Sequence, residues 1–295
     1  MTNDALRGCL VGGAIGDGLG SAYEQQRDVS FVDFDIPWQI TDDTQLTIAT
    51  CESIADTGAV SPESIAAHFL RWYNSGRLTG LGASTLKSLR DLQMGAHWWL
   101  AGRSGEYAAG NGAAMRIAPL AFFLSPADDS DRAVIRDVCS ITHKNDEAYV
   151  GGLAVIYALR AVLEGRWPGD LSLLTLITPL LPDTLVRDGL LLLQDRTELT
   201  VLEAAALVGC SGYAAQSVPF ALFAAQQSQA YSFAEILEQI IRCGGDTDTN
   251  ASIAGQVMGA YLGYSGLPVD LVERFRQIPE SDATLALADR LAKRL

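Results

Sequence analysis

Histidine is scarce in this sequence of 295 residues, which contains only His68, His97 and His143. So few imidazoles exclude histidine-rich metal chemistry, including that of HExxH proteases and of histidine–aspartate phosphohydrolases. The five cysteines are scattered and form no CxxC pair, so the sequence predicts neither a zinc site nor a disulfide framework. We interpret them as small buried hydrophobic residues in a reducing cytosol, and we expect a cytoplasmic location.

Positive charge is also in short supply. The 21 Lys and Arg residues against 35 Asp and Glu residues leave a formal net charge of 21 − 35 = −14. Such an acidic surface repels phosphate backbones and anionic lipids, which excludes general nucleic-acid binding but not a local site for an anion. The longest strongly apolar stretch, residues 171–181, is too short to span a bilayer. Residues 1–4 lack the features of a signal peptide, so no membrane association is expected.

Alternation of apolar and polar residues, which indicates a half-buried strand, is nearly absent and confined to residues 31–34. Helical periodicity dominates, and Ser61-Pro62-Glu63 is typical of a helix start. No long linker, repeat or charge block divides the chain. The sequence therefore predicts one all-α domain over residues 1–295. The expected helices cover residues 43–55, the segment that begins at Ser61, and residues 131–141, 146–164, 182–193, 201–208, 216–227, 232–242, 250–262 and 282–295.

A glycine-rich polar motif, GDGLGSAYE at residues 16–24, follows the small residues Gly12-Gly13-Ala14. A helix rich in glycine and alanine permits a close approach by a neighbouring backbone, at a cost near 1 kcal/mol for each interior glycine. Asp17 within such a helix must be paired, capped or close to a cation. A local helix cap at Asp17 is the structural alternative.

Two acidic motifs, TDDT at residues 41–44 and GGDTDT at residues 244–249, each open a predicted helix. TDDT alone fits a simple N-cap, whereas GGDTDT offers more oxygen-bearing side chains than one cap needs. If the motifs meet, their four aspartates would repel one another strongly even at an effective dielectric constant near 20. Carboxylate and hydroxyl oxygens suit Mg²⁺ or Mn²⁺, and two such ions would cancel the charge.

The segment GNGAAMR at residues 110–116 places Asn111 between two glycines. Such glycines let backbone N–H groups turn toward an anion, although a tight turn before a helix is the structural alternative. Thr142-His143 also stands out, with a structural role for His143 as the alternative.

These motifs, together with Gly80-Leu81-Gly82 and Thr85, resemble the ADP-ribosylglycohydrolase family in their order along nearly the whole chain. The family includes the dinitrogenase-reductase-activating glycohydrolase and mammalian ADP-ribosylhydrolases. The resemblance implies a compact, orthogonal multi-helix bundle and two Mg²⁺ or Mn²⁺ ions. Their implied ligands are Thr41, Asp42, Asp43, Asp246, Asp248 and Thr249.

The resemblance also implies the remaining site residues. The catalytic carboxylates would be Glu24 and Asp43, and the 110–114 loop would wrap the phosphates of ADP-ribose. His143 and Tyr149 would line the nucleotide pocket, with Tyr149 as the aromatic surface for adenine. The implied substrate-binding residues are Asp17, Gly110, Asn111, Gly112, Ala113, Ala114, Met115, His143 and Tyr149.

The implied reaction is hydrolysis of the N- or O-glycosidic bond at ribose C1″, releasing ADP-ribose from a protein side chain or a small acceptor. This reaction needs an activated water, assistance to the leaving group and a positioned ribose. A non-catalytic ADP-ribose binder, a crystallin-like relative and a Mg²⁺-dependent nucleotide phosphohydrolase are the alternatives. GSAYE favours a serine-type linkage and Trp98-Trp99 a bacterial-style member, so arginine, serine, O-acetyl and nucleobase linkages all stay open.

Overall fold

The computed structural model describes residues 2–24, 26 and 29–295. Within this part of the chain the architecture is helical, and the strands are the two-residue segments β1 (Arg103–Ser104) and β2 (His143–Lys144), which pair in parallel. The prediction of an all-α fold is confirmed. The α-helices are α1 (Thr2–Gly20), α2 (Asp42–Thr57), α3 (Pro62–Asn74), α4 (Ala83–Gln93), α5 (Trp98–Ala101), α6 (Asp129–Ser140), α7 (Asp146–Leu163), α8 (Leu173–Ile177), α9 (Leu185–Leu193), α10 (Val201–Val208), α11 (Ala214–Gln226), α12 (Phe233–Arg242), α13 (Thr247–Leu262), α14 (Val269–Phe275) and α15 (Ser281–Ala292).

The helices expected from periodicity are present, with differences at their ends. Helix α13 begins at Thr247 rather than at residue 250, so Asp248 and Thr249 lie inside its first turn. Residues 111–116 form a 3₁₀ helix, η2 (Asn111–Arg116), where a turn was the structural alternative. Helices α4, α5, α8 and α14 were not anticipated; α5, α8 and α14 span only four, five and seven residues, too few for a clear periodic signal.

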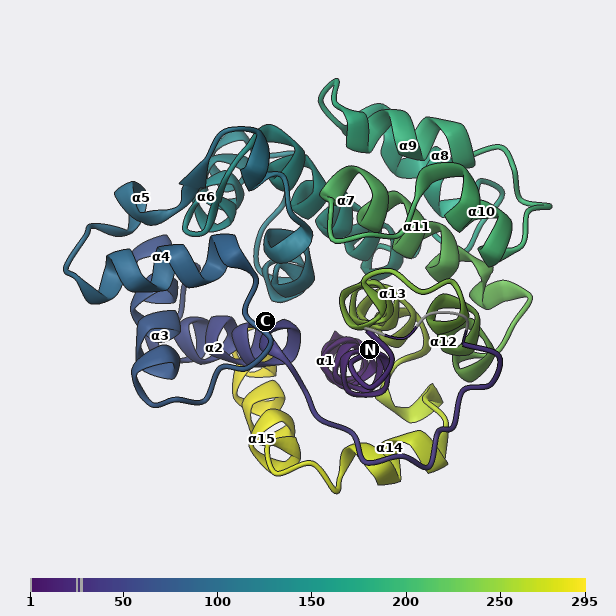
Figure 1. The fold of residues 1–295 in the computed structure, drawn as a ribbon, viewed down its shortest axis with the longest axis horizontal. Helices are drawn as coiled ribbons and strands as arrows, with labels where there is room; N and C mark the ends of the chain where they lie inside the picture. Colours follow the sequence, from purple (N-terminus) through teal and green to yellow (C-terminus); the bar gives the residue numbers. More distant parts are fainter. Residues whose placement is uncertain (1, 25, 27–28) are drawn as a thin grey trace.

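Helices α1 and α13 lie side by side at the centre of the bundle, seen nearly end-on in Figure 1. They run antiparallel, since Gly8 lies against Gly259, Gly12 against Gly255, and Gly20 against Thr247. A Cβ atom on any of these α1 glycines would come within 2.5 Å of a carbonyl oxygen of α13. The predicted close backbone approach is therefore realised between these two helices, and it brings the C-terminus of α1 to the N-terminus of α13.

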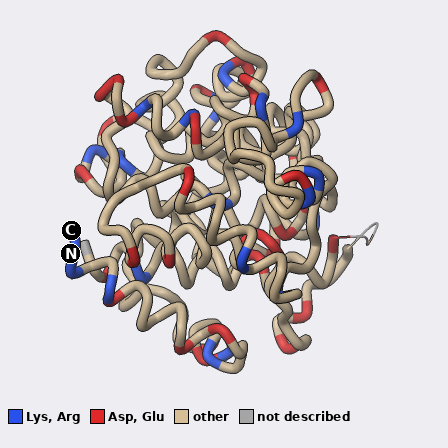
Figure 2. Tube along the Cα trace, turned by 90° about the vertical axis from the view of Figure 1, so that its left-hand side faces the viewer, with Lys and Arg blue, Asp and Glu red and all other residues tan. Residues whose placement is uncertain are grey.

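The other helices surround this pair. Helices α3 to α6 lie on one side together with α2, helices α7 to α11 lie on the other, and α14 and α15 lie below in Figure 1. Figure 2 shows acidic and basic positions interspersed along the trace, so no face seen in that view is basic throughout. None of the helices in the described ranges combines the length and apolarity that crossing a lipid bilayer requires.

Candidate active site

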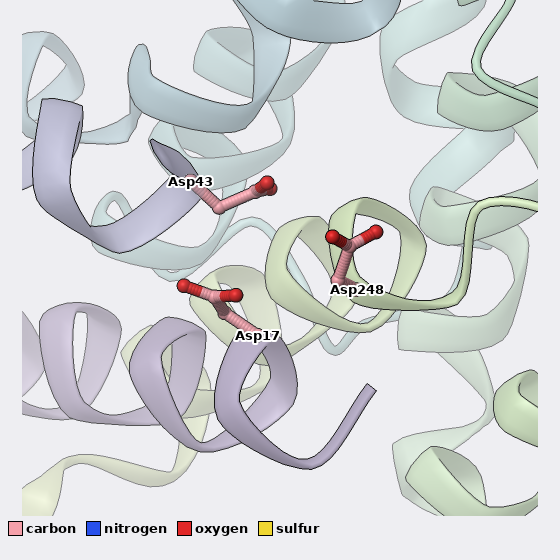
Figure 3. A group of neighbouring side chains, drawn as sticks. All are labelled: Asp17, Asp43 and Asp248. Atoms are coloured by element: carbon pink, nitrogen blue, oxygen red, sulfur yellow. The ribbon is translucent and has the colours of Figure 1, made fainter. Parts of the chain in front are cut away.

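Three helix ends meet beside the central pair. Asp17 comes from the last turn of α1, Asp43 from the first turn of α2 and Asp248 from the first turn of α13, and their carboxylates point toward one another (Figure 3). The Thr249 hydroxyl donates a hydrogen bond of 3.2 Å to Asp43 Oδ2 across a sequence separation of 206 residues. The TDDT and GGDTDT motifs thus lie together in space.

The carboxylates form two groups that share one member. Oxygen atoms of Asp17, Asp43 and Asp248 lie within 4.8 Å of one another, and so do oxygen atoms of Glu24, Asp246 and Asp248. Asp248 therefore lies between two acidic groups. The structure thus brings together the acidic side chains that the sequence analysis expected to meet.

Asp17 lies beneath the pocket rather than in it. Its side chain is 0% exposed and accepts hydrogen bonds from the backbone N–H groups of Thr41 and Thr44 and from the Thr41 hydroxyl at 2.8 Å. A carboxylate at the N-terminus of α2 also interacts favourably with the helix dipole. Asp17 therefore fixes the start of α2 against the end of α1, and the predicted contact with substrate does not fit its position.

Thr41 combines a capping role with a place beside the carboxylates. Its hydroxyl accepts from the Asp43 N–H as the N-cap of α2 and donates to Asp17 Oδ1. At α13 the N-cap residue is Asp246, whose side chain makes no capping hydrogen bond. The Asp246 carboxylate is thus left for another partner, which disfavours the simple N-cap interpretation of GGDTDT.

Burial makes the ionised form of these aspartates unfavourable. Burial and then the charge of Asp248 raise the pKa of Asp43 well above its usual range, and burial and then Asp17 do the same to the pKa of Asp42. Burial, followed by contact with Asp246, raises the pKa of Asp248 to about 9. Asp43 Oδ1 is buried without a hydrogen-bond partner among the described residues. An orphaned oxygen within a set of hard oxygen donors fits a Mg²⁺ or Mn²⁺ ligand set.

Glu24 lies at the exposed rim of the second group, in the turn that follows α1. Partial burial and then the negative charge of Asp246 raise its pKa. Glu24 is thus a carboxyl group that stays accessible to solvent and holds its proton more readily than an ordinary glutamate.

The glycine-flanked loop is tied directly to the acidic groups. Asn111 Nδ2 donates to Asp246 Oδ2 at 2.8 Å and to Ser217 Oγ at 3.0 Å, and the Asn111 N–H donates to the carbonyl of Gly212. The Asn111 amide therefore orients an acidic side chain. Ala113 and Ala114, two of the predicted substrate-binding residues, are fully buried in the core instead.

His143 packs against the same loop from β2. A Cβ atom on Gly112 would lie 2.8 Å from its Cε1 atom, and a Cβ atom on Gly110 would lie 3.2 Å from its Nε2 atom. Burial, followed by the positive charges of Arg116 and Arg103, lowers the pKa of His143 to about 3. The imidazole is therefore neutral at physiological pH.

Tyr149 is not at the pocket. It is buried in the first turn of α7, where its ring faces the Arg136 guanidinium of α6 at 4.3 Å. The aromatic residue that does line the pocket is Tyr107, which is 74% exposed, with Arg103 at 5.7 Å from its ring centroid. The sequence analysis missed this pair. An aromatic and a basic residue in a polar segment just before GNG were the available signal.

These elements enclose an open pocket of about 280 Å³. Acidic and threonine side chains form one wall, the loop and His143 another, and Arg103 and Tyr107 the rim. The lining residues are Glu24, Asp42, Asp43, Gly80, Gly82, Ala83, Ser84, Thr85, Arg103, Tyr107, Gly110, Asn111, Gly112, Met115, His143, Gly212, Asp246, Asp248 and Thr249.

Comparison with known proteins gives the class to which this fold and site belong. A model of the ADP-ribosylglycohydrolase family matches residues 1–295, so the chain belongs to the ADP-ribosylglycohydrolase family. A solved structure, an ADP-ribosylglycohydrolase-related protein complex, superposes with a TM-score of 0.77 at 25% identity over 99% of this chain and 98% of that one.

Two named relatives cover most of the chain. ADP-ribosylarginine hydrolase Tri1 of Pseudomonas putida is 27% identical over an alignment of 288 positions that covers 92% of this chain and 74% of that protein. ADP-ribosylhydrolase ARH3 of Homo sapiens is 26% identical over an alignment of 334 positions that covers 94% of this chain and 90% of that protein. The resemblance, the fold type and the prediction of a glycosidic-bond hydrolase are thereby confirmed.

Proposed function

We propose that this protein uses two divalent cations to hydrolyse the glycosidic bond at ribose C1″ and release ADP-ribose from a modified protein side chain or a small acceptor. The observation that carries this proposal is the pair of acidic groups that share Asp248 and open into the same pocket as the GNG loop. We further propose that residues 1–295 act as one domain in the cytoplasm.

The proposed cation ligands come from both acidic motifs. Bound there, Mg²⁺ or Mn²⁺ would offset the carboxylate charge and act as Lewis acids toward ribose hydroxyls and water. The ligands would be Thr41, Asp42, Asp43, Asp246, Asp248 and Thr249, which lie in or beside the two acidic groups. Support comes from the raised pKa values of Asp42, Asp43 and Asp248 and from the orphaned Asp43 Oδ1 atom.

Glu24 and Asp43 are the proposed proton carriers. An oxocarbenium-like transition state needs one carboxyl group to protonate the departing atom and another to take a proton from the attacking water. Glu24 is accessible to solvent and its pKa is raised, which favours it as the group that would protonate the departing atom. Asp43 is buried among the acidic side chains and is placed to orient the water.

The rest of ADP-ribose would lie along the opposite wall. The backbone N–H groups of the 110–112 segment and the His143 ring line the pocket and would meet the phosphates. We propose Tyr107, in place of Tyr149, as the stacking surface for adenine, with Arg103 beside it. The net charge of −14 is then compatible with an anionic ligand, because the phosphates face the loop and not the carboxylates.

The acceptor from which ADP-ribose is removed is the finer question. Tri1 is named for ADP-ribosylarginine, and ARH3 is named for ADP-ribose without an acceptor. The two relatives match at 27% and 26% identity, so similarity alone favours neither linkage.

The experiment incubates the purified protein with arginine-linked, serine-linked and O-acetyl ADP-ribose substrates in the presence of Mg²⁺ or of EDTA. We expect intact ADP-ribose from at least one substrate, lost with EDTA and in Asp248→Asn, and kept in the matched surface variant Asp270→Asn. Release of inorganic phosphate would indicate the nucleotide phosphohydrolase instead. Binding of ADP-ribose without cleavage of any substrate would indicate a non-catalytic binder.

A further inference from the structure

Arg116 is a buried cation without a carboxylate partner. It ends η2 directly behind the GNG loop, is 0% exposed, and takes part in none of the ion pairs of the described residues. Its guanidinium donates instead to the carbonyl of Gly112, to the carbonyl of Val138 at 3.4 Å and to the hydroxyl of Thr142 at 2.8 Å. Burying a charge without a partner of opposite charge is costly in free energy. The hydrogen bonds of Arg116 therefore have to offset this cost, and they point to a role for the buried guanidinium.

The bond to Thr142 decides where the hydroxyl hydrogen points. A guanidinium only donates hydrogen bonds, so Thr142 Oγ1 must accept from Arg116. Thr142 is 0% exposed, and the one other hydrogen-bond partner of its hydroxyl among the described residues is His143 Nδ1 at 2.7 Å. The hydroxyl hydrogen stays unpaired unless it is donated to Nδ1, and an unpaired buried hydroxyl is unfavourable.

An Nδ1 atom that accepts a hydrogen bond cannot carry the imidazole proton. The neutral ring must then be protonated at Nε2, the nitrogen that faces the loop at Gly110. Strand β2 also holds His143 in register with Arg103 on β1, so the ring is fixed by its backbone as well. His143 thus presents a neutral N–H donor where it lines the pocket.

We propose that Arg116 and Thr142 are positioning residues that hold His143 in the Nε2–H tautomer, as a donor to a phosphate oxygen of the ligand. This inference deepens the proposed function and rests on it, because the ligand is ADP-ribose. The hydrogen bonds run from the Arg116 guanidinium, which keeps its proton, through the Thr142 hydroxyl to the His143 ring. The donor therefore does not depend on protonation of the histidine.

The first experiment reads the tautomer in the ligand-free protein. The ¹⁵N NMR spectrum of the imidazoles is simple, since the chain has three histidines. We expect His143 to carry its proton on Nε2 with a hydrogen-bonded Nδ1. In Thr142→Val the Nδ1 resonance should move toward that of a free acceptor, and in Thr142→Ser it should not. A proton on Nδ1 in the unmodified protein would overturn the proposal.

The second experiment measures ADP-ribose affinity by calorimetry. Losing one oriented hydrogen bond should weaken binding about three- to tenfold in Thr142→Val, and less than twofold in Thr142→Ser. In a His143→Gln background the Thr142→Val effect should disappear, because the glutamine amide donates without help from Thr142. Arg116→Lys should weaken ADP-ribose binding by about as much as Thr142→Val does. The melting curve of the Arg116→Lys variant reports whether that variant folds.

The outcomes separate this inference from the function on which it rests. Equal ADP-ribose affinity in Thr142→Val and the unmodified protein would overturn the positioning role and leave the proposed function standing. Failure of the unmodified protein to bind ADP-ribose would overturn the proposed function and, with it, the purpose of the donor. An equal loss on adding Thr142→Val to His143→Gln would show a purely structural effect and overturn the inference.

Discussion

The antiparallel contact between α1 and α13 predicts that one methyl group added at Gly16 will force the two helices apart. A Cβ atom on Gly16 would lie 2.1 Å from the carbonyl oxygen of Ala251 and 2.5 Å from its carbonyl carbon. Since Cβ atoms essentially never approach within 3.0 Å, the backbones must separate by at least 3.0 − 2.1 = 0.9 Å. No side-chain rotation can relieve this clash, because both opposing atoms belong to the backbone.

The cost follows from packing. A gap of about 0.5–1 Å forfeits a quarter to a half of the dispersion attraction between facing atoms, and overpacking a core costs about 1–3 kcal/mol. We expect the upper end, about 3 kcal/mol, because rigid backbone is the obstacle. Replacing an interior helical glycine by alanine returns about 1 kcal/mol of helix propensity. Gly16→Ala should therefore lower the free energy of unfolding by about 2 kcal/mol.

Gly18→Ala is the matched control in the same helix. Its added Cβ atom would meet the Cβ of Trp38 at 3.2 Å, which a small adjustment can relieve. Urea denaturation of the two variants should show a loss for Gly16→Ala and a change near zero for Gly18→Ala. Calorimetry should also show weaker Mg²⁺ uptake in Gly16→Ala, since Asp17 moves with its helix. Equal stability of the two variants would refute the reasoning.

Three further predictions concern the pocket. Mg²⁺ should raise the melting temperature of the unmodified protein but not that of Asp248→Asn, because Asp248 belongs to both acidic groups. Scanning fluorimetry with and without EDTA measures this difference. An equal rise in both proteins would contradict the shared site. The pKa of His143 is lowered from 6.5 to about 3, so its contribution to stability is present above pH 6.5 and is lost as the pH falls. Between pH 6.5 and 4.5 the free energy of unfolding, measured by urea denaturation, should fall by about 2 kcal/mol more in the unmodified protein than in His143→Gln. An equal fall in both proteins would show that the imidazole is not buried in its neutral form. Tyr107→Ala should weaken ADP-ribose binding at least about fivefold in calorimetry, whereas Tyr231→Ala, another exposed tyrosine, should not; equal affinities would exclude stacking on Tyr107.

The sequence analysis identified the acidic residues that the structure brings together, because their signal lies in two short motifs. GGDTDT carries more oxygen ligands than a helix cap can use, and together with TDDT that excess led us to predict a cation site before any distance was known. The sequence also contains the residues that bring the motifs together: glycines spaced four residues apart in both α1 and α13, where the two helices are in contact. That spacing places small residues on one helix face, but it does not name the partner helix.

The other half of the site depended on tertiary placement. Tyr149 follows His143 by six residues, yet the start of α7 turns its ring toward Arg136 and away from the pocket. Tyr107 precedes the GNG loop in a segment without helical periodicity, and only the pairing of β1 with β2 brings that segment beside His143. Residue type and sequence position could have marked Tyr107 as a candidate, but only the tertiary structure shows that Tyr107 lines the pocket and that Tyr149 does not.

The charge balance of the site explains why its two halves are separate. Six carboxylates, those of Glu24, Asp17, Asp42, Asp43, Asp246 and Asp248, lie in or beside the two acidic groups. The N-termini of α2 and α13 each supply about half a positive charge, so the helix dipoles offset only about one of the six. Two divalent cations would offset four more. An anionic ligand can then enter only if its phosphates are held away from the acidic wall, at the loop that has the buried Arg116 cation directly behind it. Under the proposed function, cations would be bound by the acidic side chains and the phosphates by the loop, and Asn111 would join the two through a neutral amide rather than through a charge.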